Sequence, residues 1–181
     1  MKRPLYLPQK YPVIVGQGKG IGFCTVWSDP EWVLASAPWL KERTALIGTL
    51  YSQEGVNIIL RNLCLNPDIR YLIIWAKGEL SQTSYGQAGV QILRHLWQKG
   101  VDSQGRVKGT QFFLHPEMDL RIIRQVIKTA FPIHQPLAGE VFPKDTSGVS
   151  QVRHLGQSVY KRGTREKYGV WREELKLETG N

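Results

Sequence analysis

The chain has 181 residues, and its 24 Lys and Arg outnumber its 15 Asp and Glu, which gives a formal net charge of +9. Hydrophobic residues make up 41% of the chain and charged residues 22%, which is typical of one globular domain with a buried core. The positive charge excludes an acidic, solvating protein. It is compatible with a polyanionic partner without requiring one.

The cysteines and the apolar runs indicate the compartment. Cys24 and Cys64 both lie in apolar runs, and two cysteines are too few for a disulfide framework, so we expect a reducing cytoplasm. Prolines and a lysine interrupt the start of the chain, which argues against a signal peptide. Runs such as residues 71–76 are far shorter than the roughly 20 apolar residues of a membrane helix. We therefore expect no membrane segment.

The first half of the chain alternates strand and helix signals. Residues 1–19 carry four basic side chains, no acid and three prolines, which predicts an extended basic arm. Strands are predicted over 22–27, 45–51 and 68–76, where β-branched, aromatic and other apolar residues gather. Between the last two, a helix with an apolar stripe from Val56 to Cys64 is expected. Its predicted N-cap is Ser52, and it should end at Asn66-Pro67.

The second half continues the alternation. A helix is predicted over 85–99 with a stop at Gly100, followed by a turn over 102–105. A short strand is predicted over 106–110, either alone or as part of a longer strand that reaches Leu114. A third helix should open at Pro116, and a last strand should lie near 132–137. The fold class predicted for 20–139 is α/β, a Rossmann-like three-layer domain with a mostly parallel sheet. A loop-rich tail over 140–181 should end in a short helix.

Polar residues follow two of the predicted strands at the edge where open parallel sheets bind ligands. The candidate ligand-binding residues are Thr49, Tyr51, Ser52, Gly78, Glu79, Ser81, Thr83, Ser84, Gly86 and Gln87. The longer loop is also compatible with a plain solvated connection. In the tail, Trp171 and Leu175 share one side of the expected helix and are the candidate partner-binding residues.

The sequence contains no self-sufficient catalytic constellation. The four histidines are far apart and neither cysteine has a C-x-x-C partner, so no metal site is expected. The glycine-rich run over 16–22 lacks the spacing of a dinucleotide or phosphate loop and precedes a strand. These observations favour a non-catalytic domain.

A series of short motifs carries a family resemblance. They are Gly48 and Ser52, the run NPDIRYL at 66–72, Gly86-Gln87, and Gly100-Val101-Asp102 with Gly105-Arg106. In this order they resemble the corrinoid-holding subunit of tetrahydromethanopterin S-methyltransferase, and more closely the related domain joined to some thymidylate synthase-like proteins. The likeness covers most of residues 20–139. It implies a Rossmann-like domain in one-carbon or thymidylate-type metabolism, with a thymidylate synthase-like or one-carbon enzyme as partner.

The resemblance also bears on cofactors. In the methyltransferase, one histidine before the Gly-Gln pair ligates the cobalt of a corrinoid, whereas the equivalent position here falls near Thr83. A hydroxyl cannot replace imidazole as a strong cobalt ligand, so we do not expect a histidine-ligated corrinoid. The leading hypothesis is a non-catalytic accessory or ligand-binding domain that binds a small anionic or heteroaromatic ligand, or a partner enzyme. The alternative is a basic nucleic-acid-binding module that uses the arm and the tail.

Overall fold

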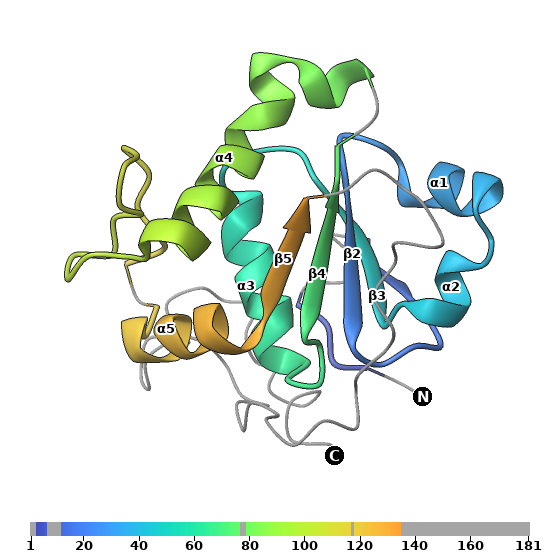
Figure 1. The fold of residues 1–181 in the computed structure, drawn as a ribbon, viewed down its shortest axis with the longest axis horizontal. Helices are drawn as coiled ribbons and strands as arrows, with labels where there is room; N and C mark the ends of the chain where they lie inside the picture. Colours follow the sequence, from blue (N-terminus) through green and yellow to red (C-terminus); the bar gives the residue numbers. More distant parts are fainter. Residues whose placement is uncertain (1–2, 7–11, 77–78, 117, 135–181) are drawn as a thin grey trace.

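The computed structural model describes residues 3–6, 12–76, 79–116 and 118–134. Strands and helices alternate along this part of the chain (Figure 1), which makes it a mixed α/β fold. The predicted tail over 140–181, with Trp171 and Leu175, lies outside the described residues. The elements are β1 (Ile14–Val15), β2 (Ile21–Val26), α1 (Pro30–Ser36), α2 (Leu40–Arg43), β3 (Leu46–Leu50), α3 (Gly55–Leu65), β4 (Tyr71–Trp75), the 3-10 helix η1 (Glu79–Gln82), α4 (Ser84–Lys99), α5 (Leu120–Thr129) and β5 (Phe131–His134).

The strands form one mixed five-stranded sheet in the order β1-β3-β2-β4-β5. β2 pairs in parallel with both β3 and β4, and β4 pairs in parallel with β5. β1 is antiparallel to β3. Because β2, β3 and β4 run in the same direction, their carboxyl ends at Val26, Leu50 and Trp75 meet at one edge of the sheet.

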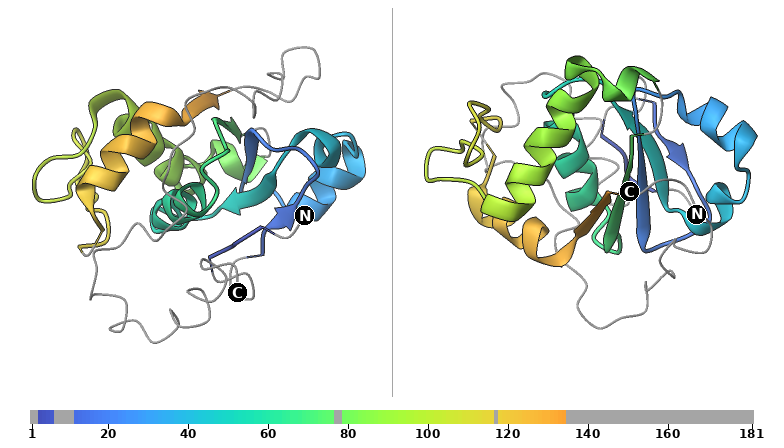
Figure 2. Two further views of the ribbon diagram at one scale, coloured as in Figure 1. Left: turned by 90° about the horizontal axis from the view of Figure 1, so that it is seen from below. Right: turned by 45° about the horizontal axis from the view of Figure 1, so that its top comes forward.

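Helices cover both faces of this sheet. Successive strand residues point to opposite faces, so Phe23 and Ile47 pack with α1 and α2, while Cys24 and Leu50 pack with α3, α4 and α5. Figure 1 shows α1 and α2 on one side of the strands and the other three helices opposite them, and the turned views of Figure 2 agree. No helix in the described ranges combines the length and the apolar character needed to cross a bilayer.

Two helices between β2 and β3 were not predicted. α1 has a strong start signal, because the Asp29 carboxylate accepts a hydrogen bond from the Glu31 backbone N–H at 2.9 Å and Pro30 occupies the first turn. α2 is a single short turn whose last residues pack near Trp39, with the Arg43 guanidinium 5.5 Å from that ring. The Asp-Pro pair is the sequence signal that could have revealed α1.

The predicted starts of two other helices are wrong. α3 begins at Gly55 after Glu54, and Ser52 contributes its backbone carbonyl, which accepts from the Gly55 N–H at 3.1 Å. α5 begins at Leu120 rather than at Pro116, because the Asp119 side chain accepts from the Arg121 backbone N–H at 3.0 Å and so caps the helix.

The predicted strand over 106–110 is also wrong. This segment belongs to a tight loop with two isolated bridges, Val101 to Val107 and Arg106 to Phe113. Gly105 and Gly109 adopt φ angles of 88° and 83°, a left-handed conformation that a continuous strand does not contain. The turn predicted over 102–105 is present, with the Gly105 N–H donating to the Asp102 carbonyl at 3.2 Å.

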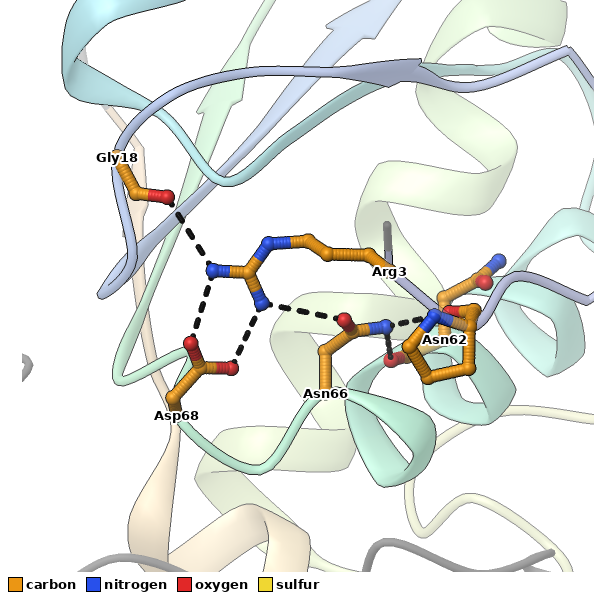
Figure 3. A network of polar contacts seen from close by, with 6 residues as sticks. Arg3, Gly18, Asn62, Asn66 and Asp68 are labelled. Atoms are coloured by element: carbon orange, nitrogen blue, oxygen red, sulfur yellow. Dashed lines mark hydrogen bonds and ion pairs between the residues drawn. The ribbon is translucent and has the colours of Figure 1, made fainter. Parts of the chain in front are cut away.

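Part of the predicted basic arm packs into the domain. Ile14 and Val15 form β1, and the side chain of Arg3 is only 5% exposed. Its guanidinium donates to both carboxylate oxygens of Asp68, at 2.9 and 2.8 Å, and to the side-chain oxygen of Asn66 at 3.2 Å. Figure 3 shows this network, which also reaches the carbonyl of Gly18. The network therefore ties the N-terminal segment to the turn between α3 and β4.

Candidate ligand-binding site

The chain leaves β2 through a strained residue at the carboxyl edge of the sheet. Trp27 has a φ of 57°, the left-handed region that bulky residues avoid. Its backbone N–H donates to the Leu50 carbonyl at 3.3 Å, and the Ser28 N–H donates to the Thr25 carbonyl at 3.2 Å. The buried Thr25 hydroxyl in turn donates to the Ser28 carbonyl. Such a conformation costs about 1–3 kcal/mol and clusters at functional sites.

The Trp27 side chain is also incompletely satisfied. Its indole ring meets the Tyr51 ring edge to face, with centroids 5.3 Å apart and planes at 89°. The indole nitrogen is buried and donates to no acceptor among the described residues. A buried donor without an acceptor costs about 1–3 kcal/mol. Trp27 therefore combines backbone strain with an unused hydrogen-bond donor at the sheet edge.

An open hollow lies against this tryptophan. We call it the aromatic hollow, and its lining residues come from the ends of β2 and β3 and from the first turns of α4. Tyr51 and Tyr85 are 52% and 78% exposed, so large aromatic surfaces face solvent there. The lining residues are Trp27, Tyr51, Ser52, Gln53, Glu54, Ser84, Tyr85 and Ala88.

A second space adjoins the hollow. We call it the apolar cavity, and it has a volume of about 390 Å³ between the sheet and α3. Its wall on the helix includes Ile58, Ile59 and Leu63, and Val13 lies on the other side. Tyr51, Ser52 and Glu54 line both spaces. The hollow and the cavity therefore meet at the end of β3.

The described residues that line these two spaces carry little charge. Glu54 is the one charged side chain among them, and its carboxylate accepts a hydrogen bond from the Asn57 amide at 3.1 Å. Cys24 lines the cavity, and burial raises the pKa of its thiol to about 12. That thiol stays protonated at neutral pH and is a poor nucleophile. The arrangement suits binding of an uncharged molecule better than binding of an anion.

Several predicted site residues do line these spaces. Tyr51 and Ser52 line both, Thr49 lines the cavity, and Ser84 lines the hollow. The Thr49 hydroxyl donates to the Thr25 carbonyl, so it supports the strand ends from within. The edge predicted after β3 and the start of α4 are thus brought together.

Other predicted residues build the start of α4. The Thr83 hydroxyl caps this helix by accepting from the Gly86 N–H at 3.1 Å, and the Gln87 amide donates to the Ser81 carbonyl at 2.6 Å. A Cβ at Gly86 would lie 2.2 Å from the Leu80 carbonyl oxygen, so only glycine fits. Gly78 lies outside the described residues, and Glu79 opens η1.

Five of the eight residues that line the aromatic hollow are missing from the predicted site. Trp27 is not among the predicted residues, although it directly follows the first strong strand, at the same edge as the other strand ends. Tyr85, Ala88 and the pair Gln53 and Glu54 are missing as well, because the prediction favours small polar residues. An aromatic residue directly after a parallel strand is the signal that could have found the hollow.

The start of α4 does not fit the cobalt ligation known from the methyltransferase. The Thr83 hydroxyl donates to the Leu80 carbonyl at 2.7 Å besides capping the helix, so it is already engaged. Within the described residues, no group of three or more His, Cys, Asp or Glu side chains is placed to hold a metal ion.

Comparisons with known proteins add no family. No family model matches the chain, and no curated protein matches it significantly.

Proposed function

We propose that this chain is a non-catalytic ligand-binding domain that holds a small, uncharged heteroaromatic molecule in the aromatic hollow. The observation that carries the proposal is Trp27, which has a left-handed backbone at the sheet edge and lines the aromatic hollow. A ring lying against Trp27 and Tyr85 would use aromatic surface that is otherwise open to water.

The strand order supports a Rossmann-like assignment for this domain. Across the sheet, the parallel strands lie in the order β3-β2-β4-β5. When these four strands are numbered along the chain, the order is 2-1-3-4, which is how the flavodoxin-like strand order begins. The order reverses at β2, and ligands of such sheets bind beyond the carboxyl ends of the strands at that reversal. Trp27 directly follows β2, so its position agrees with this rule.

The metabolic setting is proposed from the sequence resemblance. Similarity to the corrinoid-holding methyltransferase domain favours a role in one-carbon or thymidylate-type metabolism, beside a thymidylate synthase-like or one-carbon enzyme. Both cysteines are free and buried, which agrees with a reducing cytoplasm. In the hollow and the cavity, the described lining includes no histidine, lysine or arginine, and this supports binding rather than catalysis.

The nucleic-acid alternative has less support. It needs the basic residues of the N-terminal arm to contact phosphates. Arg3 instead holds Asp68 with two hydrogen bonds and is almost fully buried. The predicted stacking residues of the tail lie outside the described residues.

The proposed function is tested by binding uncharged flat molecules to the purified chain. Thymidine, adenosine, biopterin and riboflavin are suitable probes, with saturation-transfer NMR as the readout. We expect at least one probe to bind saturably, and Tyr85→Ala to weaken its binding by about tenfold or more. Trp32→Ala is the matched control, because Trp32 is 62% exposed but lies on α1, away from the hollow.

The outcomes separate clearly. Loss of binding in Tyr85→Ala with retention in Trp32→Ala supports the site. Equal binding by both variants, or no binding of any probe to the native chain, contradicts it.

A further inference from the structure

We propose that the apolar cavity takes an apolar, uncharged substituent of the same ligand, so that the ligand is a heteroaromatic ring carrying a compact apolar group. This inference rests on the proposed function for the ring and goes beyond it for the substituent. Its starting point is a partly open space of about 390 Å³ beside α3. Protein interiors are close-packed, and cavities of about 150 Å³ lined by apolar groups already take up benzene.

The floor of the cavity is made of small residues on two neighbouring strands. Gly22 and Cys24 of β2 and Gly48 of β3 lie on the sheet face that α3 covers, and Cys24 pairs directly with Gly48. Among the described residues, a Cβ added at Gly48 would meet a single atom within 4 Å, Cγ2 of Val13 at 3.7 Å. Close packing therefore does not require glycine at this position. Glycine inside a strand weakens it and often marks a place that another molecule approaches.

Thr49 and Asn62, which line the cavity away from the rim it shares with the aromatic hollow, are already paired within the protein. The Asn62 oxygen accepts from the Tyr6 N–H at 2.9 Å, and its amide donates to the Ile58 carbonyl at 3.2 Å. The hydroxyl of Thr49 donates to the Thr25 carbonyl, and the thiol of Cys24 is neutral. A polar or charged guest would lose its hydration without gaining partners, which costs several kcal/mol. The chemistry of the walls therefore selects an apolar guest.

The position of the cavity links that guest to the ring. Tyr51, Ser52 and Glu54 line both the cavity and the aromatic hollow. One molecule can therefore lie across the end of β3, with its ring against Trp27 and its substituent over Gly48. Pockets for small molecules commonly have this form, mostly apolar with a few polar groups that fix orientation.

The experiment uses N-phenyl-1-naphthylamine, an uncharged dye whose fluorescence rises in apolar surroundings, with the full chain. Gly48→Val places a branched side chain on the cavity floor, and Gly48→Ala places a single methyl group there that the space accepts. We expect the native chain to bind the dye, Gly48→Val to lose about tenfold or more in affinity, and Trp32→Ala, on α1 and outside both spaces, to stay within about twofold. Melting temperatures of both Gly48 variants should equal or exceed that of the native chain, because each adds strand propensity.

Each result bears on one claim. If the native chain does not bind the dye, or if folded Gly48→Val and Gly48→Ala bind it like the native chain, the cavity proposal is overturned. If the dye binds in a Gly48-dependent way while none of the heteroaromatic probes binds, the proposed function is overturned and the apolar cavity stands. Should Gly48→Val not fold, a graded loss of dye binding in Gly48→Ala still supports the proposal, and no loss refutes it.

Discussion

Arg3 shows how one side chain fixes the start of the domain. It lies 65 residues from Asp68 in the sequence, yet its guanidinium holds both oxygens of that carboxylate and also the Asn66 side chain. The Asn66 amide donates to the Pro4 carbonyl at 2.9 Å, so the two segments are joined in both directions. The side chain of Asp68 is 29% exposed, which makes the pair partly buried. Removing one member of this pair leaves the partly buried charge of the other without an opposite charge beside it, which destabilises the fold.

We therefore expect Arg3→Gln to lower the free energy of unfolding by about 2–4 kcal/mol, near the values for broken buried pairs. The matched control is Arg106→Gln, which breaks the ion pair with Asp102 at 3.2 Å. Arg106 is 47% exposed, and an exposed pair contributes only about 0–1 kcal/mol. Urea denaturation measures both. If Arg3→Gln and Arg106→Gln lowered the free energy of unfolding by the same amount, burial of Arg3 would add nothing to the stability that its ion pair provides.

Some residues of the candidate site could be predicted from the sequence alone. Tyr51 and Ser52 could be predicted because polar and aromatic residues at the end of a parallel strand face the ligand edge. Trp27 could not be recognised as strained, because a φ of 57° comes from the turn that Thr25 and Ser28 hold together. The hydrogen bonds that Thr83 and Gln87 make within the protein could not be predicted from the sequence either. Their partners, backbone groups of the Leu80–Gly86 turn, exist only once that turn has formed.

At the scale of elements, the start of α4 positions one side of the aromatic hollow. Thr83→Ala removes the hydroxyl that caps this helix and should lower the free energy of unfolding by about 1 kcal/mol. Ser84→Ala is the control, since Ser84 is exposed one residue further on and is not the cap. Thermal and chemical denaturation report the difference. A cost for Ser84→Ala as large as that for Thr83→Ala would place the cap elsewhere.

The start of α5 should respond to pH. The Arg121 guanidinium bonded to Asp119, at 2.9 Å, holds the pKa of that carboxyl below its ordinary value. The folded-state pKa is depressed, so the stabilisation is present above the ordinary aspartate pKa and is lost as pH falls through the folded one. Asp119→Asn keeps a capping side chain but removes the charge. We expect its melting temperature to lie below that of the native chain at neutral pH, and the gap to close in acid. A gap that does not change with pH would contradict this.

Helices and strands could be predicted from the sequence where the apolar pattern was long and where a start or stop residue marked its ends. α4 and its stop at Gly100 follow from an apolar stripe and a glycine, and β3 and β4 follow from apolar runs. α1 and α2 are too short to show a stripe, so only the Asp29-Pro30 start marked them. β1 was hidden because two residues carry no pattern and their pairing with β3 is a long-range contact.

At the scale of the whole molecule, the sheet gathers the residues of the candidate site at one edge. β2, β3 and β4 end side by side, which brings Trp27 to Tyr51 although they are far apart in the sequence. The same parallel register puts Gly22 and Gly48 on one face, where α3 covers them incompletely and leaves the apolar cavity. An aromatic hollow and an apolar cavity that share a rim are thus consequences of strand order and residue size.

The indole N–H of Trp27 offers the most direct measurement of the central claim. In ¹⁵N–¹H correlation spectra each tryptophan gives its own indole signal, and single Trp→Phe variants assign those of Trp27 and Trp32. Titration with thymidine, adenosine, biopterin and riboflavin should shift the Trp27 signal saturably for the probe that binds, because an aromatic ring bound in the hollow that Trp27 lines changes the magnetic environment of the indole, while the Trp32 signal stays in place. A bound probe that leaves the Trp27 signal unmoved, or a full titration in which no probe moves it, would contradict a ligand site at the end of β2.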